Sequence, residues 1–164
     1  MAVKKFNLVL LLMLTSAWAF AQHAGMLPVP ENLQKDAARA SAENKPLVIM
    51  FALPDCPFCK VVRRNYLAPL LKEGPENERP VIRELQITSH ESLTGFDGMS
   101  TTQSALAKQY GVRMAPTLVF VDAHGELLVP PLVGGEGAFY LNYLDRAFAD
   151  ATKNLIAAKA GKNK

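Results

Sequence analysis

One stretch of the sequence decides the fold class: Lys45-Pro46-Leu47-Val48-Ile49-Met50-Phe51-Ala52-Leu53-Pro54-Asp55-Cys56-Pro57-Phe58-Cys59. Leu47 to Ala52 is a continuous apolar run, and a strand that is apolar on both faces is normally buried centrally in a parallel or mixed sheet. Leu53-Pro54-Asp55 then ends the strand, and the two cysteines stand where the next helix begins. The stretch therefore predicts a layered α/β domain with a pair of thiols at a strand-to-helix junction.

The flanking sequence predicts further helices and strands around this central strand. Leu33, Ala37 and Ala40 recur at helical spacing, and Lys45-Pro46 ends that helix because the residue before a proline disfavours helical backbone. Thr117 to Val121 is a second apolar run and so a second buried strand. We expect helices over 31–44, from the cysteine motif to 71, over 104–110, and after Gly134-Gly135 with the apolar stripe Tyr140, Leu144, Phe148, Ala151 and Leu155. We expect strands over 47–52, 81–87 (half-buried) and 117–121, with a hairpin return over 126–129. The segment 88–102 is expected to be a long loop.

The first 21 residues have the parts of a secretory signal peptide. Lys4-Lys5 gives a positive start, Leu8 to Leu14 is apolar and uncharged, and Ala19-Phe20-Ala21 supplies the small residues of a cleavage site. An uncleaved anchor is disfavoured because Phe6 to Phe20 is shorter than the roughly 20 residues of a spanning helix. We therefore expect a cleaved signal peptide over 1–21 and a periplasmic protein, with a mobile lead-in over 22–30, one domain over 31–158 and a polar C-terminal tail over 159–164.

Composition excludes several classes of function. The 164 residues are 49% hydrophobic and 20% charged, which is typical of one globular domain. The formal net charge of +3 falls to +1 without Lys4-Lys5, and to −2 once Lys159, Lys162 and Lys164 of the tail are also set aside. A nearly neutral body has no electrostatic footprint for nucleic acid or anionic lipid, so we expect neither as a partner.

The two cysteines, the only ones in the chain, are suited to chemistry. A disulfide between residues three apart closes a very short loop, so it removes little entropy from the unfolded chain and stabilises the fold weakly. At the helix N-cap, Cys56 lies near unpaired backbone N–H groups that favour its thiolate, and its pKa should fall below the free value of about 8.5. Cys59 follows one turn later on the same face and can attack a mixed disulfide formed by Cys56.

A metal site is the main alternative for such a pair. Structural zinc needs four ligands, commonly two Cys-x-x-Cys pairs or added histidines. Here no third cysteine exists, and the three histidines, His23, His90 and His124, are scattered along the sequence. We therefore expect neither a metal nor another cofactor.

At this point the chain resembles the thioredoxin family, over nearly all of the mature sequence. The run from Lys45 to Ala52 is similar to the central strand of secreted thioredoxin-like proteins, and the run from Tyr110 to Asp122 is similar to the second signature of the family. The turn from Asp122 to Glu126 and the segment Val133-Gly134-Gly135 resemble its hairpin and closing loop. Phe96-Asp97-Gly98 resembles the periplasmic SoxW-type branch. The implied fold is a central mixed β-sheet flanked by helices.

The resemblance also implies a substrate-binding surface. Pro116 would be a cis-proline facing the active-site cysteines, and Ala115 would offer its backbone to an extended client segment. Pro57, the first helical residue, and Phe58, a surface aromatic beside the disulfide, would contact clients as well. The sequence departs from the family at Asp55, where thioredoxins often have Trp.

Two further departures concern the chemistry of the pair. Met50 stands where many relatives place a buried acid, which leaves Glu84, Glu126 or water to deprotonate Cys59. The Pro-Phe dipeptide shares its proline with the strongly oxidising Cys-Pro-His-Cys type but lacks the histidine, which favours a weaker oxidant or a reductant.

The function that we expect is a periplasmic thiol–disulfide oxidoreductase in which Cys56 attacks and Cys59 resolves. A reductase or exchange enzyme is favoured, acting as a monomer on exported clients with disulfides or dithiols and exchanging electrons with a membrane donor or acceptor. The alternatives are a dithiol oxidase that donates its disulfide to folding proteins, and a module that binds a peptide or metal without turnover.

Overall fold

The computed structural model describes residues 26–135, 137 and 139–162, so the expected signal peptide lies outside the described residues. Its centre is a four-stranded sheet in the order β2-β1-β5-β6, built from β2 (Val81–Gln86), β1 (Leu47–Ala52), β5 (Thr117–Val121) and β6 (Leu132–Val133). β1 and β2 run parallel, whereas β1–β5 and β5–β6 are antiparallel. The predicted α/β fold with a central mixed sheet is confirmed.

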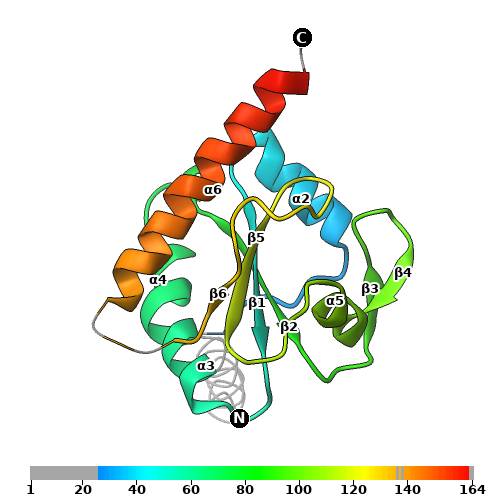
Figure 1. The fold of residues 1–164 in the computed structure, drawn as a ribbon, viewed down its shortest axis with the longest axis vertical. Helices are drawn as coiled ribbons and strands as arrows, with labels where there is room; N and C mark the ends of the chain where they lie inside the picture. Colours follow the sequence, from blue (N-terminus) through cyan, green and yellow to red (C-terminus); the bar gives the residue numbers. More distant parts are fainter. Residues whose placement is uncertain (1–25, 136, 138, 163–164) are drawn as a thin grey trace, which may run out of the picture.

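Helices cover both faces of this sheet (Figure 1). On one side lie α3 (Pro57–Val61), α4 (Ala68–Leu70) and α6 (Tyr140–Lys162), and on the other lie α2 (Leu33–Ala42) and α5 (Gln103–Gln109). Successive β1 side chains point to opposite faces, so Met50 joins the core under α3 and α6 while Phe51 joins the core under α2 and α5. Cys59 belongs to the first of these cores.

The helix after the cysteines differs in detail from the regular helix that the sequence predicts. After α3 the backbone continues as a π-helix over Val62–Leu67 and then as α4, so the helical segment has nearly the predicted length. A π-helix has more residues per turn than an α-helix and rotates the side chains that follow it. Val62, Leu67 and Ala68 are buried in this segment, whereas Tyr66 and Leu70 are only partly buried.

Of two expectations for the outer parts of the fold, one is wrong and the other holds only in part. The predicted loop over 88–102 contains a hairpin of β3 (Ser92–Thr94) and β4 (Ser100–Thr102), followed directly by α5. The predicted return over 126–129 does run back along the end of β5, with an antiparallel bridge between Leu127 and Val121 and a hydrogen bond of 2.9 Å from the Leu128 N–H to the Phe120 carbonyl, but the strand that pairs with β5 is β6. Pro130 and Pro131 separate the two segments, and proline has no N–H to donate to a ladder.

The described part of the lead-in packs against the domain instead of extending freely. Leu27 is buried, and the Pro28 carbonyl accepts a hydrogen bond of 2.9 Å from the backbone N–H of Glu84 in β2. The segment thereby covers the outer edge of β2, and this strand is more deeply buried than its alternating sequence predicts. Among the described residues, no helix is both long and apolar enough to cross a bilayer.

The C-terminal helix α6 extends into the part of the chain expected to be a tail. It runs to Lys162, and the Lys159 ammonium donates a hydrogen bond of 2.9 Å to the Asn44 side-chain oxygen at the end of α2. Its predicted apolar stripe is present, with Tyr140, Leu144, Ala151 and Leu155 buried. Tyr140 and Leu144, near the start of α6, belong to the same core as Cys59.

Candidate active site

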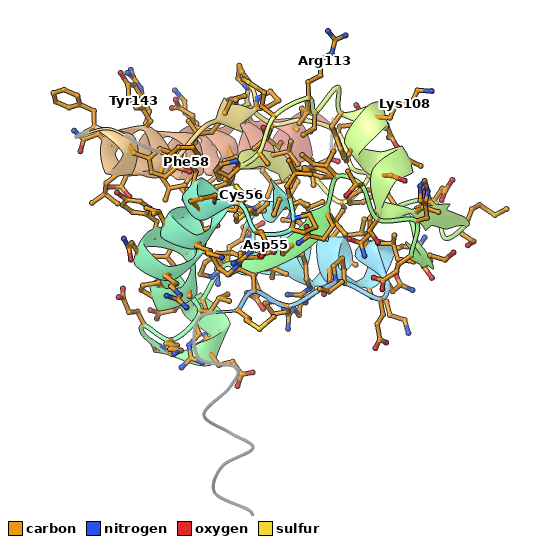
Figure 2. All side chains as sticks on the ribbon, turned by 90° about the horizontal axis from the view of Figure 1, so that it is seen from below. Asp55, Cys56, Phe58, Lys108, Arg113 and Tyr143 are labelled. Carbon is orange, nitrogen blue, oxygen red and sulfur yellow. A yellow bond between two sulfur atoms is a disulfide. The ribbon has the colours of Figure 1, made fainter. Side chains whose placement is uncertain are left out.

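Cys56 and Cys59 form a disulfide at the N-terminus of α3 (Figure 2). Cys56 is the N-cap residue with extended backbone, and its sulfur accepts the backbone N–H of Cys59 at 3.1 Å. Pro57 occupies the first turn, where its missing N–H leaves no bond unmade. Cys56 is partly exposed, whereas Cys59 is only 1% exposed. Solvent therefore reaches Cys56, whereas Cys59 is enclosed.

Asp55 sets the direction in which the chain enters this helix. Its φ is +55°, in the left-handed region that few residues other than glycine adopt and that Asp and Asn tolerate best. The Asp55 side chain is exposed beside Cys56 (Figure 2). The departure from the family pattern thus puts one negative charge at the edge of the active site.

The loop before β5 faces the disulfide. The Ala115–Pro116 peptide bond is cis, and the Ala115 carbonyl oxygen lies 3.9 Å from the Cys56 sulfur. The Thr117 hydroxyl donates to the Met114 carbonyl at 2.8 Å and closes the loop. The site residues Ala115 and Pro116, predicted from sequence, therefore lie next to the cysteines although about 60 positions separate them in the chain.

Gly135 joins a third segment to these two. A Cβ atom at this position would overlap a methyl group of Val62 and would lie 3.0 Å from Pro116 Cγ and 3.4 Å from the Phe58 carbonyl. Only glycine lets the segment after β6 approach the cysteine helix and the proline loop so closely. The resemblance to the thioredoxin family implies that Val133-Gly134-Gly135 is its closing loop. In the structure, Gly135 of this loop lies against the cysteine helix and Pro116.

Exposed apolar side chains occur next to Cys56 and in the two segments that approach the cysteine helix. Phe58 is 44% exposed next to the disulfide, as expected for a residue that contacts clients, and Pro57 is exposed beside it. Met114 and Val133 are also largely exposed. Met114 precedes Ala115, the residue before the cis-proline, and Val133 directly precedes Gly134-Gly135. Their positions within the motifs that resemble the family were therefore the available signal.

A buried ion pair lies on the strand next to Met50. Glu84 faces Met50 in the parallel register of β1 and β2, and it accepts hydrogen bonds from Arg63 Nε at 2.7 Å and Arg63 Nη2 at 2.6 Å. Gln86 Nε2 adds a third bond at 3.0 Å. The hydrogen bond to Glu84 raises the pKa of the Arg63 guanidinium despite the opposing effect of burial. Sequence reasoning had no means of finding the partner, because Arg63 and Glu84 are distant in the chain.

The Arg63–Glu84 ion pair also affects which base can deprotonate Cys59. Both oxygens of Glu84 are engaged, so this carboxylate is not placed to accept a proton. Glu126 lies at the opposite end of β5 from Pro116, and its backbone carbonyl accepts a hydrogen bond of 3.0 Å from the Asp122 N–H. It is therefore at the end of the strand away from the cysteines. Of the three bases named from sequence, we therefore expect water to act.

The sheet order and the helix-capping disulfide opposite a cis-proline loop define a thioredoxin-like thiol–disulfide oxidoreductase. The family model described as a thioredoxin-like domain matches residues 33–138, and the chain belongs to this family. The family model does not distinguish the branches of the family, so the SoxW-type assignment stays a prediction.

Solved structures share the fold at low sequence identity. A thioredoxin from Thermus thermophilus is 20% identical with a TM-score of 0.50, over 79% of this chain and 91% of that chain. A DsbH oxidoreductase is 20% identical with a TM-score of 0.51, over 78% of this chain and 89% of that chain. No curated protein sequence matches the chain.

Proposed function

We propose that the protein is an exported oxidoreductase that reduces or exchanges disulfides of periplasmic client proteins. The observation that carries the proposal is the asymmetry of the pair: Cys56 is partly exposed at a helix N-cap, 3.9 Å from the Ala115 carbonyl, while Cys59 is enclosed. An exposed sulfur stabilised by a backbone N–H suits the attacking thiol, and an enclosed neighbour suits the resolving thiol.

The reaction proceeds by two exchanges of sulfur partners. The Cys56 thiolate attacks a client disulfide, an S–S bond to Cys56 forms, and one client thiolate leaves. Cys59 then loses its proton to water and attacks the Cys56 sulfur, which releases the second client thiol and forms the Cys56–Cys59 disulfide seen in the structure. The client loses no atoms and gains two electrons and two protons.

Export is proposed from the sequence of residues 1–21, and it sets the electron supply. The periplasm is kept oxidising, so a reductase there needs electrons from a membrane donor. The Pro-Phe dipeptide supports a reductase or exchange enzyme, because no histidine follows Pro57 to stabilise the thiolate further. A dithiol oxidase that passes its disulfide to folding proteins is the second candidate, and a measured reduction potential near that of thioredoxin, about −270 mV, would exclude it.

Reduction of insulin by dithiothreitol tests the activity. With catalytic amounts of this protein, we expect precipitation of the insulin B chain to begin much earlier than with dithiothreitol alone, because Cys56 offers a larger thiolate fraction. The Cys56→Ser/Cys59→Ser double variant is the matched control and should give no acceleration. If the wild-type protein also fails to accelerate the reaction, the pair does not turn over, and a module that binds without catalysis is the better description.

A further inference from the structure

A cavity of about 330 Å³ lies at the C-terminal end of α5 and is lined in part by the segment that leads to the cis-proline. Ile87, which lines it, follows β2 and donates its N–H to the Ala52 carbonyl at 2.9 Å, four residues before Cys56. Arg113 also lines it, two residues before Ala115. An extended chain advances about 3.3 Å per residue, and Arg113 is two residues from Ala115, so we expect a client side chain two or three residues from the reacting cysteine to come within reach of Arg113.

The cavity is basic. Lys108 and Arg113 line it together with small and apolar residues, and none of the acidic residues that the structure describes lines it. Both cations are exposed, and neither forms an ion pair within the part of the chain that the structure describes. A client carboxylate entering here would meet two positive charges that no described acid neutralises.

The other side of the disulfide has a different character. Figure 2 shows Phe58 and Tyr143 on one side of Cys56, and Arg113 and Lys108 on the other. Tyr143 is 59% exposed, and Phe58 belongs to the exposed apolar residues described above. Asp55 stands next to Cys56 and repels a carboxylate placed directly over the sulfur. The face is therefore polarised, apolar on one flank and basic on the other.

We infer that the active site selects client segments that carry an acidic side chain on the Arg113 flank of the reacting disulfide and apolar side chains on the Phe58 flank. The inference rests on the proposed function and specifies its substrate class. Complementary charges at the rim of an interface act mainly through the association rate and are weakened by salt, so the selectivity should appear in the second-order rate constant.

Four peptide homodimers, each joined by one disulfide, test this selectivity. Each peptide carries Asp or Lys two residues before or two residues after its cysteine, with Leu at the matching position on the other flank. The reduced protein attacks through Cys56, releases one peptide thiol, then releases the second as the Cys56–Cys59 disulfide closes. One of the two positions, before or after the cysteine, places the charged side chain over the cavity. For that position, the Asp peptide should react about fivefold faster than the Lys peptide at low ionic strength, and high salt should reduce the ratio of the two rates.

Charge variants separate recognition from catalysis. Lys108→Ala/Arg113→Ala should bring the ratio to about one, whereas Lys72→Ala/Lys153→Ala removes two exposed charges elsewhere and should keep it. Equal rates for the Asp and Lys peptides with the wild-type protein, or a preference that survives in the first double variant, overturn the inference and leave the oxidoreductase activity standing. If the wild-type protein reduces neither the peptides nor insulin, the proposed function fails and the inference falls with it.

Discussion

Replacing Cys56 by Ser is expected to lower the rate of insulin reduction by at least about a thousandfold, because a serine hydroxyl cannot replace the attacking thiolate. Cys59→Ser should also stop turnover, but at a later step. Cys56 still attacks in that variant, no resolving thiol follows, and a mixed disulfide between Cys56 and the client accumulates. Non-reducing electrophoresis followed by mass spectrometry would identify the trapped species and its bonded cysteine.

The two single variants serve as controls for each other, since each keeps one thiol of the pair. Cys56→Ser should capture almost no client because Cys59 is enclosed by the core under α6. Equal trapping by both variants would show that the enclosed sulfur is as accessible as the exposed one. The assignment of attacking and resolving roles would then be wrong.

Breaking the buried ion pair should give the largest effect on stability. Glu84→Ala leaves Arg63 without its partner where the side chain is only 17% exposed, and removing one member of a buried pair costs about 3 kcal/mol or more. The free energy of unfolding from urea denaturation of the oxidised protein would measure this loss. The fold depends on the pair locally, because it connects the helix after the cysteines to β2.

A double variant distinguishes loss of the pair from loss of packing. Arg63→Met/Glu84→Leu replaces both charges by apolar side chains of similar size, and such replacements are often neutral or stabilising. We therefore expect it to recover most of the loss in Glu84→Ala. A Glu84→Ala loss below about 1 kcal/mol would show that the pair behaves like an exposed one.

Sequence reasoning predicted the parts of the fold whose signal is local. β1 and β5 are continuous apolar runs, and the α6 stripe repeats at helical spacing, so each pattern specifies its own burial. The cysteine helix begins where its capping residue and Pro57 indicate. The cysteines and the proline loop were brought together by resemblance, because no local pattern encodes a contact between Cys56 and Ala115.

The parts that were missed depend on contacts between distant segments. β3 and β4 are three-residue strands made mostly of Ser and Thr, and the backbone hydrogen bond from the Thr94 N–H to the Glu31 carbonyl holds the hairpin to the residues just before α2. Their polar sequence resembles that of a loop. The burial of Glu84 likewise depends on Arg63 and on the covering lead-in. The buried face of the cysteine helix depends on a π-helix that no pattern in its sequence predicts.

The most direct test of the central claim is the rate at which each thiol of the reduced wild-type protein is alkylated between pH 5 and pH 9. Digestion and mass spectrometry after a short pulse of iodoacetamide would give the modified fraction of Cys56 and Cys59 separately. Cys56 should react first, with a midpoint below the free-thiol pKa of about 8.5, because the N-terminus of α3 stabilises its thiolate. Cys59 should react at least about tenfold more slowly, because it is buried. Faster alkylation of Cys59, or a Cys56 midpoint at or above 8.5, would contradict the account.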